Sequence, residues 1–366
     1  MKITDVAQVT RPYRICVMRG DGIGPEIMDA ALLVLNSISK VFGLKFSYVE
    51  VPAGDAALRD YGDALPQKSI EAFASSDACL KGPVGETIMD LNNKLRFGFD
   101  LYANLRPAKS YPGICPPALK PDIDLVVIRE NSEGFYRALE AEVEPGIWTN
   151  TGVFTEKAAR RIAELSFRLS RSRRRKSEQE KARKVTLATK TNIFRNTHGM
   201  YLRIFTELAE SYHDIGFEHY YADALCAALV RQPEKFDIIT SENLLADLLS
   251  DLAGQVAGGL GMTPGTNINY ETKHAYFEPT HGSAPDIAGT GVANPIGQIR
   301  SAALMLEYLG FVHEDDRAVR AAEAVESAIE SLLNSHDRSK FPRELGGEAN
   351  TRAVARSVAA LISSSK

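Results

Sequence analysis

Short apolar runs alternate with helix-like stretches along most of this chain. The runs that read as buried strands are residues 15–18, 78–80, 125–128, 185–188 and 236–239. The stretches that read as helices include residues 25–39, 155–170 and 198–211. Such alternation predicts an α/β fold with a largely parallel sheet, because parallel neighbouring strands need a long crossover connection between them.

The composition excludes several classes of function. The chain has 366 residues, 44% of them hydrophobic, and a net charge of −4, which suits a globular protein of two domains or one large α/β unit. A slightly acidic chain is not expected to bind nucleic acid or a membrane surface, and the basic segment 170–184 reads as an exposed loop without aromatic residues. No apolar run reaches about 18 residues. Four scattered cysteines without C-x-x-C spacing predict a reduced, cytoplasmic protein.

A glycine-rich turn follows the first predicted strand. Its sequence is Gly20-Asp-Gly-Ile-Gly24, and Pro25 then begins a helical stretch. A dinucleotide-binding fingerprint reads G-x-G-x-x-G, so the third glycine is misplaced here and a proline follows it. The turn therefore does not predict an ordinary Rossmann fold.

Two groups of charged residues suggest a site for a metal and an acidic substrate. Asp247 and Asp251 are four residues apart in a leucine-rich helical stretch, which places both carboxylates on one helix face. This pair could hold a hard divalent cation, or it could be a solvated polar stripe. Arg96, Arg106 and Arg129 lie near apolar segments, and their planar guanidinium groups suit substrate carboxylates. Surface ion pairs are the alternative for any single arginine.

Four longer motifs make a family resemblance specific. They span residues 20–26, 100–107, 129–136 and 277–289, and the likeness runs in order from about residue 14 to residue 310. The chain resembles the β-decarboxylating dehydrogenases, which include isocitrate, 3-isopropylmalate, homoisocitrate and tartrate/D-malate dehydrogenases. The resemblance implies an isocitrate/isopropylmalate dehydrogenase-like fold, with two domains around a mixed, largely parallel sheet. The large domain would comprise residues 1–107 and 263–366, and the small domain residues 108–262, with a dimer-forming clasp near 138–154.

The resemblance also implies roles for individual residues. Arg96, Arg106 and Arg129 match the substrate-carboxylate arginines, Tyr136 the general acid and Lys190 the proton relay. The residues that match the ligands of Mg2+ or Mn2+ are Asp223, Asp247 and Asp251. In the family the lysine and the first aspartate come from the neighbouring subunit, which implies a homodimer with shared active sites. The residues assigned to NAD are Glu278, His281, Gly282, Ser283, Ala284, Asp286, Ile287 and Asn294 in one loop region, and Asn192.

The expected reaction is the NAD-dependent oxidative decarboxylation of a 3-substituted (R)-malate to a 2-oxo acid, CO2 and NADH. Asp286 favours NAD, because a carboxylate accepts hydrogen bonds from the ribose hydroxyls and repels a 2′-phosphate. Asn92 and Asn93 stand where isopropylmalate enzymes carry leucines, which favours a polar, isocitrate-like substrate. The alternatives are 3-isopropylmalate, homoisocitrate or tartrate/D-malate as substrate, a non-catalytic regulatory subunit, and a metal-dependent hydrolase or lyase.

Overall fold

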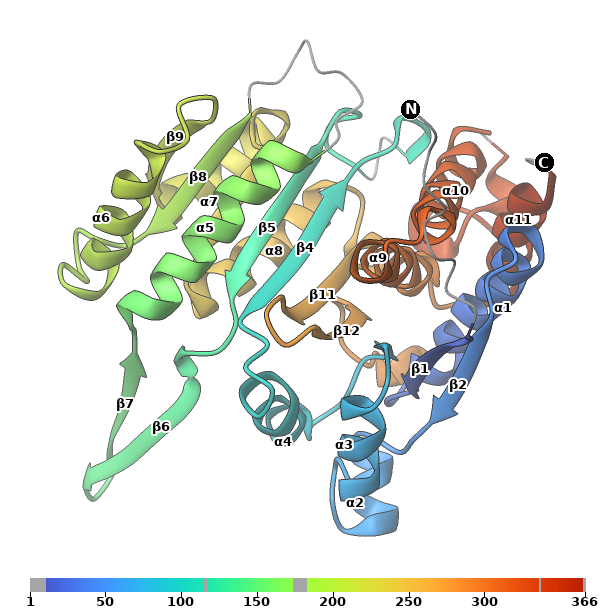
Figure 1. Ribbon diagram of the computed structural model, residues 1–366, viewed down its shortest axis with the longest axis horizontal. Coiled ribbons are helices and arrows are strands. Elements are labelled where there is room, and N and C mark those ends of the chain that lie inside the picture. The colour runs from blue at the N-terminus through green and yellow to red at the C-terminus, as the bar shows by residue number, and fades with distance from the viewer. Residues whose placement is uncertain (1–10, 115–117, 174–182, 336, 365–366) are drawn as a thin grey trace. The chain divides into compact units, whose positions relative to one another are not determined.

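The computed structural model describes residues 11–114, 118–173, 183–335 and 337–364 (Figure 1). The chain forms two compact units. Unit 1 comprises Met1–Phe99, Tyr111–Ile114 and Gly259–Lys366, and unit 2 comprises Asp100–Ser110 and Cys115–Gly258. The expected boundary at residue 107 falls inside strand β4 (Ala103–Lys109), which pairs along its length with β5 (Asp124–Glu130) in unit 2.

In unit 1 the strands lie in the order β2-β1-β3-β12-β11, with parallel pairing except between β11 and β12. The helices α9 and α1 pack against each other, and α9 also contacts β11 and β12. The elements of unit 1 are β1 (Tyr13–Met18), α1 (Gly24–Phe42), β2 (Phe46–Glu50), α2 (Asp55–Tyr61), α3 (Gln67–Ala74), β3 (Ala78–Lys81), α4 (Ile88–Asn92), a π-helical turn (Asn93–Phe97), β11 (Pro264–Asn269), β12 (His274–Pro279), α9 (Ile296–His313), α10 (Asp316–Asn334) and α11 (Thr351–Ser364).

In unit 2 the strands lie in the order β4-β5-β10-β8-β9, and only β4 and β5 are antiparallel neighbours in that run. Helix α5 lies over one face of these strands, and α7 and α8 lie over the other (Figure 1). The elements of unit 2, besides β4 and β5, are β6 (Gly134–Glu144), β7 (Ile147–Val153), α5 (Glu156–Ser172), β8 (Lys184–Thr189), α6 (Thr197–Ala209), β9 (Gly216–Tyr221), α7 (Ala222–Arg231), β10 (Ile238–Ser241) and α8 (Asn243–Val256).

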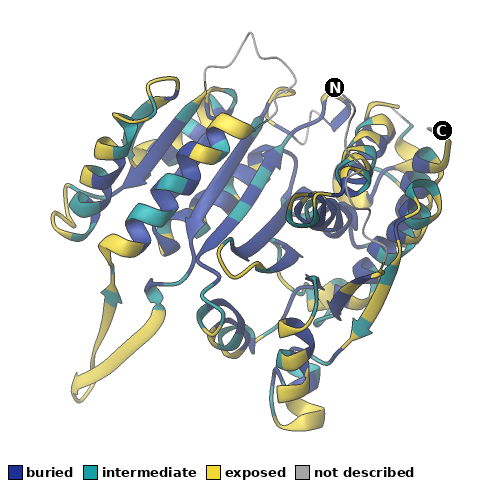
Figure 2. Cartoon of the chain, viewed as in Figure 1, coloured by how far each residue is buried: buried dark blue, intermediate teal, exposed yellow. Residues whose placement is uncertain are grey.

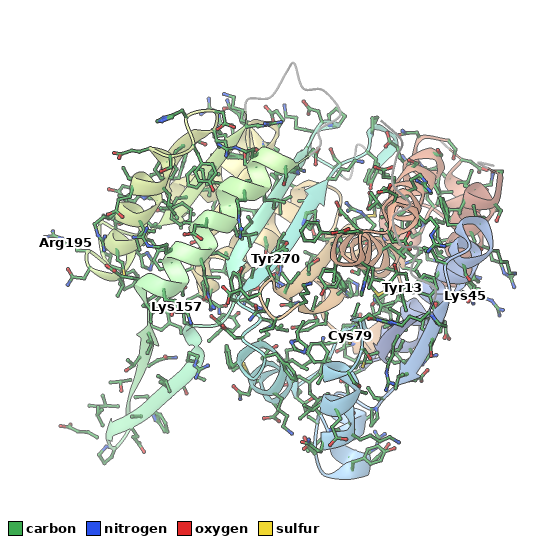
Figure 3. The ribbon with its side chains drawn as sticks, in the orientation of Figure 1. Tyr13, Lys45, Cys79, Lys157, Arg195 and Tyr270 are labelled. Carbon is green, nitrogen blue, oxygen red and sulfur yellow. The ribbon has the colours of Figure 1, made fainter. Side chains whose placement is uncertain are left out.

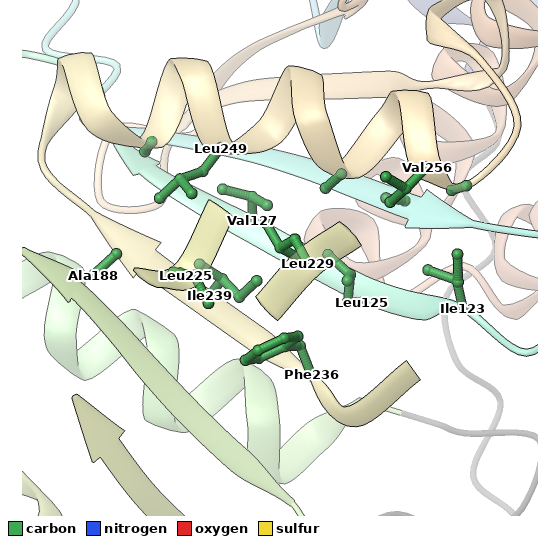
Figure 4. Packing of buried hydrophobic residues seen from close by; sticks show 14 residues of the cluster. Ile123, Leu125, Val127, Ala188, Leu225, Leu229, Phe236, Ile239, Leu249 and Val256 are labelled. Carbon is green, nitrogen blue, oxygen red and sulfur yellow. The ribbon is translucent and has the colours of Figure 1, made fainter. Parts of the chain in front are cut away.

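A single apolar cluster holds α7 and α8 against the strands of unit 2. Figure 4 shows Leu225 and Leu229 of α7 and Leu249 of α8 beside Val127 of β5 and Ile239 of β10. Each of these five side chains is at most 1% exposed. Burying an aliphatic side chain contributes roughly 1.5–3 kcal/mol, so the core fixes the face that each helix turns to the sheet. The opposite face of α8 carries Asp247 and Asp251.

Strands β6 and β7 form a separate antiparallel hairpin, which extends away from the rest of unit 2 (Figure 1). Nearly all of it is exposed (Figure 2), and Trp148 at 65% exposure is its largest uncovered apolar side chain. Leu139, Val143 and Ile147 are about half exposed as well. An isolated two-stranded hairpin is marginally stable in water, and these apolar residues are largely uncovered within the described part of the chain.

The predicted α/β class and the mixed, largely parallel strand pairing are confirmed in both units. The last predicted strand, 236–239, is displaced by two residues: β10 begins at Ile238, because Pro233–Lys235 form a 3-10 turn and the Phe236 amide bonds to the Pro233 carbonyl. Most of the basic segment 170–184 lies outside the described residues. Within the described part of the chain, every helix is too short or too polar to cross a bilayer.

Candidate active site

Helix α8 presents Asp247 and Asp251 on its polar face. The helix begins at a strong cap, since the Glu242 carboxylate accepts hydrogen bonds from the Leu244 and Leu245 amides at 3.0 and 2.8 Å. The predicted spacing is confirmed, and the two carboxylates lie one helical turn apart. Burial, followed by repulsion from Asp247, raises the pKa of the Asp251 carboxyl, while Arg106 lowers it.

Two buried arginines contact these carboxylates. Arg106, on β4, places Nη1 at 2.9 Å from Asp247 Oδ1 and at 3.2 Å from Asp251 Oδ1. Arg129, near the end of β5, contacts Asp247 Oδ1 through Nη1 and donates from Nε to the Asn243 Oδ1 at 2.8 Å. The arginines expected to bind substrate carboxylates therefore converge on the expected metal ligands, and their charge offsets the repulsion between the two anions.

Tyr136 completes this cluster. It lies on β6, and its phenol donates a hydrogen bond to Asp247 Oδ2. The Arg129 guanidinium stacks over the tyrosine ring at 4.5 Å from the centroid. Burial raises the pKa of the Tyr136 phenol; Arg129 lowers this pKa and Asp247 raises it. The phenol is thus protonated at neutral pH and can donate a proton.

Lys190 and Asp223 form a second pair. Lys190 follows β8, Asp223 lies in the first turn of α7, and Nζ donates to Oδ1 at 2.8 Å. The hydrogen bond from Lys190 lowers the pKa of the exposed Asp223 carboxyl. No group of three acidic, histidine or cysteine residues in the described part of one chain is arranged to hold a metal ion. Asp247 and Asp251 thus offer two of the hard oxygen ligands that Mg2+ or Mn2+ prefers, and Asp223 does not join them within a single chain.

Arg96 belongs to a buried charge network in unit 1. Its Nε donates to the Tyr276 hydroxyl at 2.8 Å, and its Nη2 lies 3.3 Å from Glu278 Oε1. Lys81, at the end of β3 and 1% exposed, donates to Glu278 Oε2 at 2.5 Å. Sequence reasoning assigned Glu278 to the cofactor and missed Lys81. The available signal was a lysine that directly follows the apolar run 78–80.

The two asparagines of the specificity segment differ in environment. Asn92 ends α4 and is 4% exposed, whereas Asn93 is exposed and opens the π-helical turn that carries Arg96. Asn93 lines a surface hollow together with Asp63 and Lys94. The amide of Asn93 is therefore accessible to water in the structure.

The predicted cofactor loop follows β12 and packs on the glycine-rich turn. The Ile23 amide donates to the Ser283 carbonyl at 2.9 Å. Gly22 has φ +57°, and a Cβ there would lie 1.9 Å from the Ser283 carbonyl oxygen. The glycines thus permit close packing of this turn against the loop, and Ile287 and Ala284 pack against Ile23 in a small apolar cluster.

The polar groups of this loop fit a bound dinucleotide in part. Thr280 Oγ1 and His281 Nε2 are buried and have no hydrogen-bond partner among the described residues. Burial lowers the pKa of the His281 ring, which is therefore neutral near pH 7 and can donate or accept. Asn294 is already engaged, because its Nδ2 donates to Glu344 Oε2 at 2.7 Å and its Oδ1 accepts from the Ile296 amide. Asn192 is exposed in the turn after Lys190, in unit 2.

Glu130, next to Arg129, is a buried acid that sequence reasoning did not single out. Its carboxylate accepts hydrogen bonds from the Ser132 hydroxyl at 2.5 Å and from the Glu133 amide at 3.0 Å. Burial nevertheless raises the pKa of Glu130 to about 7. Arg161 lies 3.9 Å away and is also paired with Asp100, and burial still dominates the pKa of Glu130.

We expect the raised pKa of Glu130 to make the folded protein less stable as pH rises from about 4.5 to 7. In this range the unfolded chain has released the proton and the folded chain retains it, so the free energy of unfolding falls with pH. Replacing Glu130 with glutamine should remove this loss. The free energy of unfolding of the variant, relative to that of wild type, should then rise by roughly 2–3 kcal/mol between about pH 4.5 and 7. Denaturant unfolding at several pH values measures the free energy of unfolding of both proteins. Glu210→Gln, at an exposed glutamate, is the control. If the free energy of unfolding changed with pH in the same way in Glu130→Gln and wild type, the raised pKa of Glu130 would be refuted.

Comparison with known proteins gives consistent matches. A sequence model described as isocitrate/isopropylmalate dehydrogenase matches residues 14–358. The chain is 44% identical over 347 residues to the 3-isopropylmalate/3-methylmalate dehydrogenase of Methanocaldococcus jannaschii, covering 95% of this chain and 98% of that one. It is 38% identical over 340 residues to the 3-isopropylmalate dehydrogenase of Saccharolobus solfataricus, covering 93% and 96%. The crystal structure of isocitrate dehydrogenase from Methylococcus capsulatus has a TM-score of 0.86 and 34% identity, covering 96% and 99%.

Proposed function

The chain belongs to the isocitrate/isopropylmalate dehydrogenase family, and we propose that it oxidises and decarboxylates a 3-alkylmalate, with 3-isopropylmalate as the favoured substrate and NAD as the oxidant. The family makes it an oxidoreductase of the decarboxylating hydroxyacid dehydrogenase class. The observation that carries the proposal is the cluster on α8, where Arg106, Arg129 and Tyr136 converge on Asp247.

The choice of substrate departs from the isocitrate-like preference expected from Asn92 and Asn93. That preference assumed that both amides face the 3-substituent and would lose hydrogen bonds beside an alkyl group. Asn93 is exposed, so its amide remains hydrated and would not lose hydrogen bonds beside an alkyl group. The named activities of the Methanocaldococcus and Saccharolobus relatives also favour the alkyl alternative. Isocitrate is the second candidate, supported by the buried amide of Asn92 and the Methylococcus structure.

In the proposed reaction the side chains of this protein bind the acid and move its protons. Arg96, Arg106 and Arg129 bind the substrate carboxylates, for which a guanidinium offers two parallel donors. Lys190 takes up the hydroxyl proton as hydride leaves, and Tyr136 donates a proton to the carbon that loses CO2. Asp247 and Asp251, with Asp223 of the second copy, would hold Mg2+ or Mn2+, which would supply positive charge beside the substrate oxygen, and NAD bound at the loop after β12 would supply the hydride acceptor.

The proposed NAD site comprises the loop residues Glu278, His281, Gly282, Ser283, Ala284, Asp286, Ile287 and Asn294, with Asn192 at the nicotinamide. The buried Thr280 hydroxyl and His281 Nε2 are additional polar groups for the dinucleotide. Asp286 would exclude a 2′-phosphate by charge repulsion, so NAD is preferred over NADP.

We also propose a homodimer in which Lys190 and Asp223 serve the site of the second copy. Support comes from exposed apolar side chains on the two helices that carry the proposed metal ligands. Leu244 and Leu248 lie on α8 with the aspartates, and Val230 lies on α7 with Asp223; Leu248 is 61% exposed. The hairpin β6–β7, with Trp148 uncovered, is proposed as the clasp between copies. A cytoplasmic location fits the free cysteines Cys16, Cys79 and Cys226.

Steady-state formation of NADH or NADPH tests the proposal. The acids to compare are 3-isopropylmalate, isocitrate, homoisocitrate, D-malate and tartrate, each with Mg2+ or Mn2+ and with NAD or NADP. We expect the highest kcat/KM for 3-isopropylmalate, and at least about tenfold preference for NAD. A kcat/KM highest for isocitrate would make isocitrate the favoured substrate in place of 3-isopropylmalate. If no acid led to reduction of NAD or NADP, the enzyme assignment would be refuted.

A further inference from the structure

The turn that carries Lys190 is fixed by a buried histidine that the proposed reaction does not use. His198 lies in the first turn of α6, eight residues beyond Lys190, and is 3% exposed. Its Nδ1 accepts a hydrogen bond from the Lys190 backbone amide at 2.8 Å. The Lys190 carbonyl in turn accepts from the Ile193 and Phe194 amides at 3.0 and 2.8 Å. Both backbone groups of the lysine are therefore bonded within one turn.

Aromatic rings hold the imidazole in place. The Phe194 ring centroid lies 4.9 Å from that of His198, and the Phe154 ring meets it edge-on at 5.9 Å. Burial lowers the pKa of His198 to about 4, so the ring is neutral near pH 7 and Nδ1 is available as an acceptor. Arg195, in the same turn, lies exposed at the edge of unit 2 (Figure 3).

The Lys190 side chain continues from this anchored backbone to Asp223. Its Nζ lies 2.8 Å from Asp223 Oδ1 and 5.9 Å from the centre of the Tyr221 ring. Lysine has a long flexible side chain, so its direction depends on where the backbone at its base is held. A misplacement of about 1 Å in a reacting group can cost on the order of a hundredfold in rate.

We propose that His198 is a positioning residue: its Nδ1 holds the Lys190 amide at the end of β8 and so directs the lysine side chain to its working place beside Asp223. The inference rests on the proposed function, in which Lys190 takes up the substrate hydroxyl proton. His198 itself contacts neither substrate nor cofactor in this account.

Two amide substitutions test the proposal, because they differ in where the acceptor stands. In His198→Asn the Oδ1 replaces Nδ1 at the same distance from the backbone, whereas in His198→Gln the oxygen lies one bond farther out. We expect His198→Gln to lower kcat about tenfold to a hundredfold, with KM for the acid and for NAD within about twofold of wild type. His198→Asn should retain kcat within about threefold, and His213→Gln, at an exposed histidine, should match wild type.

Hydrogen exchange at the Lys190 amide gives a second readout that does not require activity. We expect exchange at this amide to speed up at least about tenfold in His198→Gln and to stay slow in His198→Asn. Unchanged exchange in His198→Gln, or an unchanged kcat despite faster exchange, would overturn the proposal. A wild-type protein that is inactive on every acid would refute the proposed function instead, and the exchange result would still decide whether His198 holds the turn.

Discussion

Replacing Asp247 with asparagine is expected to lower kcat/KM at least about a thousandfold, because one neutral amide would replace the carboxylate on which the site converges. Asp247 accepts from Arg106, Arg129 and Tyr136 and is a proposed metal ligand. The concentration of Mg2+ or Mn2+ needed for half-maximal rate should rise as well. Steady-state kinetics over a range of metal concentrations measure both effects.

The Asp247→Asn result requires a folded protein, since the change leaves two buried guanidinium groups without their shared anion. Thermal unfolding and the oligomeric state should therefore be measured for the same preparation. Asp214→Asn removes an exposed aspartate that pairs with Arg171, and it should leave turnover within about twofold of wild type. Undiminished turnover in folded Asp247→Asn would remove α8 from the catalytic site.

A charge at Leu248 is expected to separate the proposed dimer and to abolish turnover. Leu248 is 61% exposed and lies between the two aspartates of α8 in sequence. In Leu248→Glu an unpaired carboxylate would have to be buried in an apolar contact between copies, which costs several kcal/mol. Light scattering should report a monomer at concentrations where wild type is a dimer, and activity should fall at least about a hundredfold.

The matched control for Leu248→Glu is Leu58→Glu, at a 44% exposed leucine of α2 in unit 1. This control should keep both the dimer and the activity. A fully active monomer in Leu248→Glu would show that one chain suffices for the chemistry. A dimer that persists unchanged would place the contact between copies elsewhere.

Much of the fold follows from local sequence patterns. The apolar runs at 15–18, 78–80, 125–128 and 185–188 lie within β1, β3, β5 and β8, because buried parallel strands are apolar on both faces. The run at 236–239 is displaced from β10, because an apolar run indicates burial and not strand geometry. Phe236 is buried like a strand residue, yet it lies in the turn before β10. The predicted isocitrate/isopropylmalate dehydrogenase-like fold is confirmed by the Methylococcus neighbour.

Residue spacing predicts only part of the candidate site, and the other site residues were expected from the family resemblance. The four-residue interval between Asp247 and Asp251 determines a shared helix face, and their place on α8 is as predicted. The raised pKa of Glu130 depends on packing by distant segments, which no local pattern encodes. The apolar run before Lys81 indicates its burial, but its pairing with Glu278 is not a local pattern either. The exposure of Asn93 could not be predicted for a related reason, since sequence does not tell which way a residue faces at a π-helical turn.

Activity of mixed dimers tests the shared site most directly. Lys190→Met and Asp247→Asn should each be inactive alone, but a chain of one kind can supply what the other lacks. After the two variants are unfolded and refolded together in equal amounts, we expect about a quarter of wild-type activity, because half of the dimers are mixed and each mixed dimer holds one intact site of two. A mixture that contains mixed dimers and remains inactive would contradict the claim that Lys190 and Asp247 of different chains form one active site.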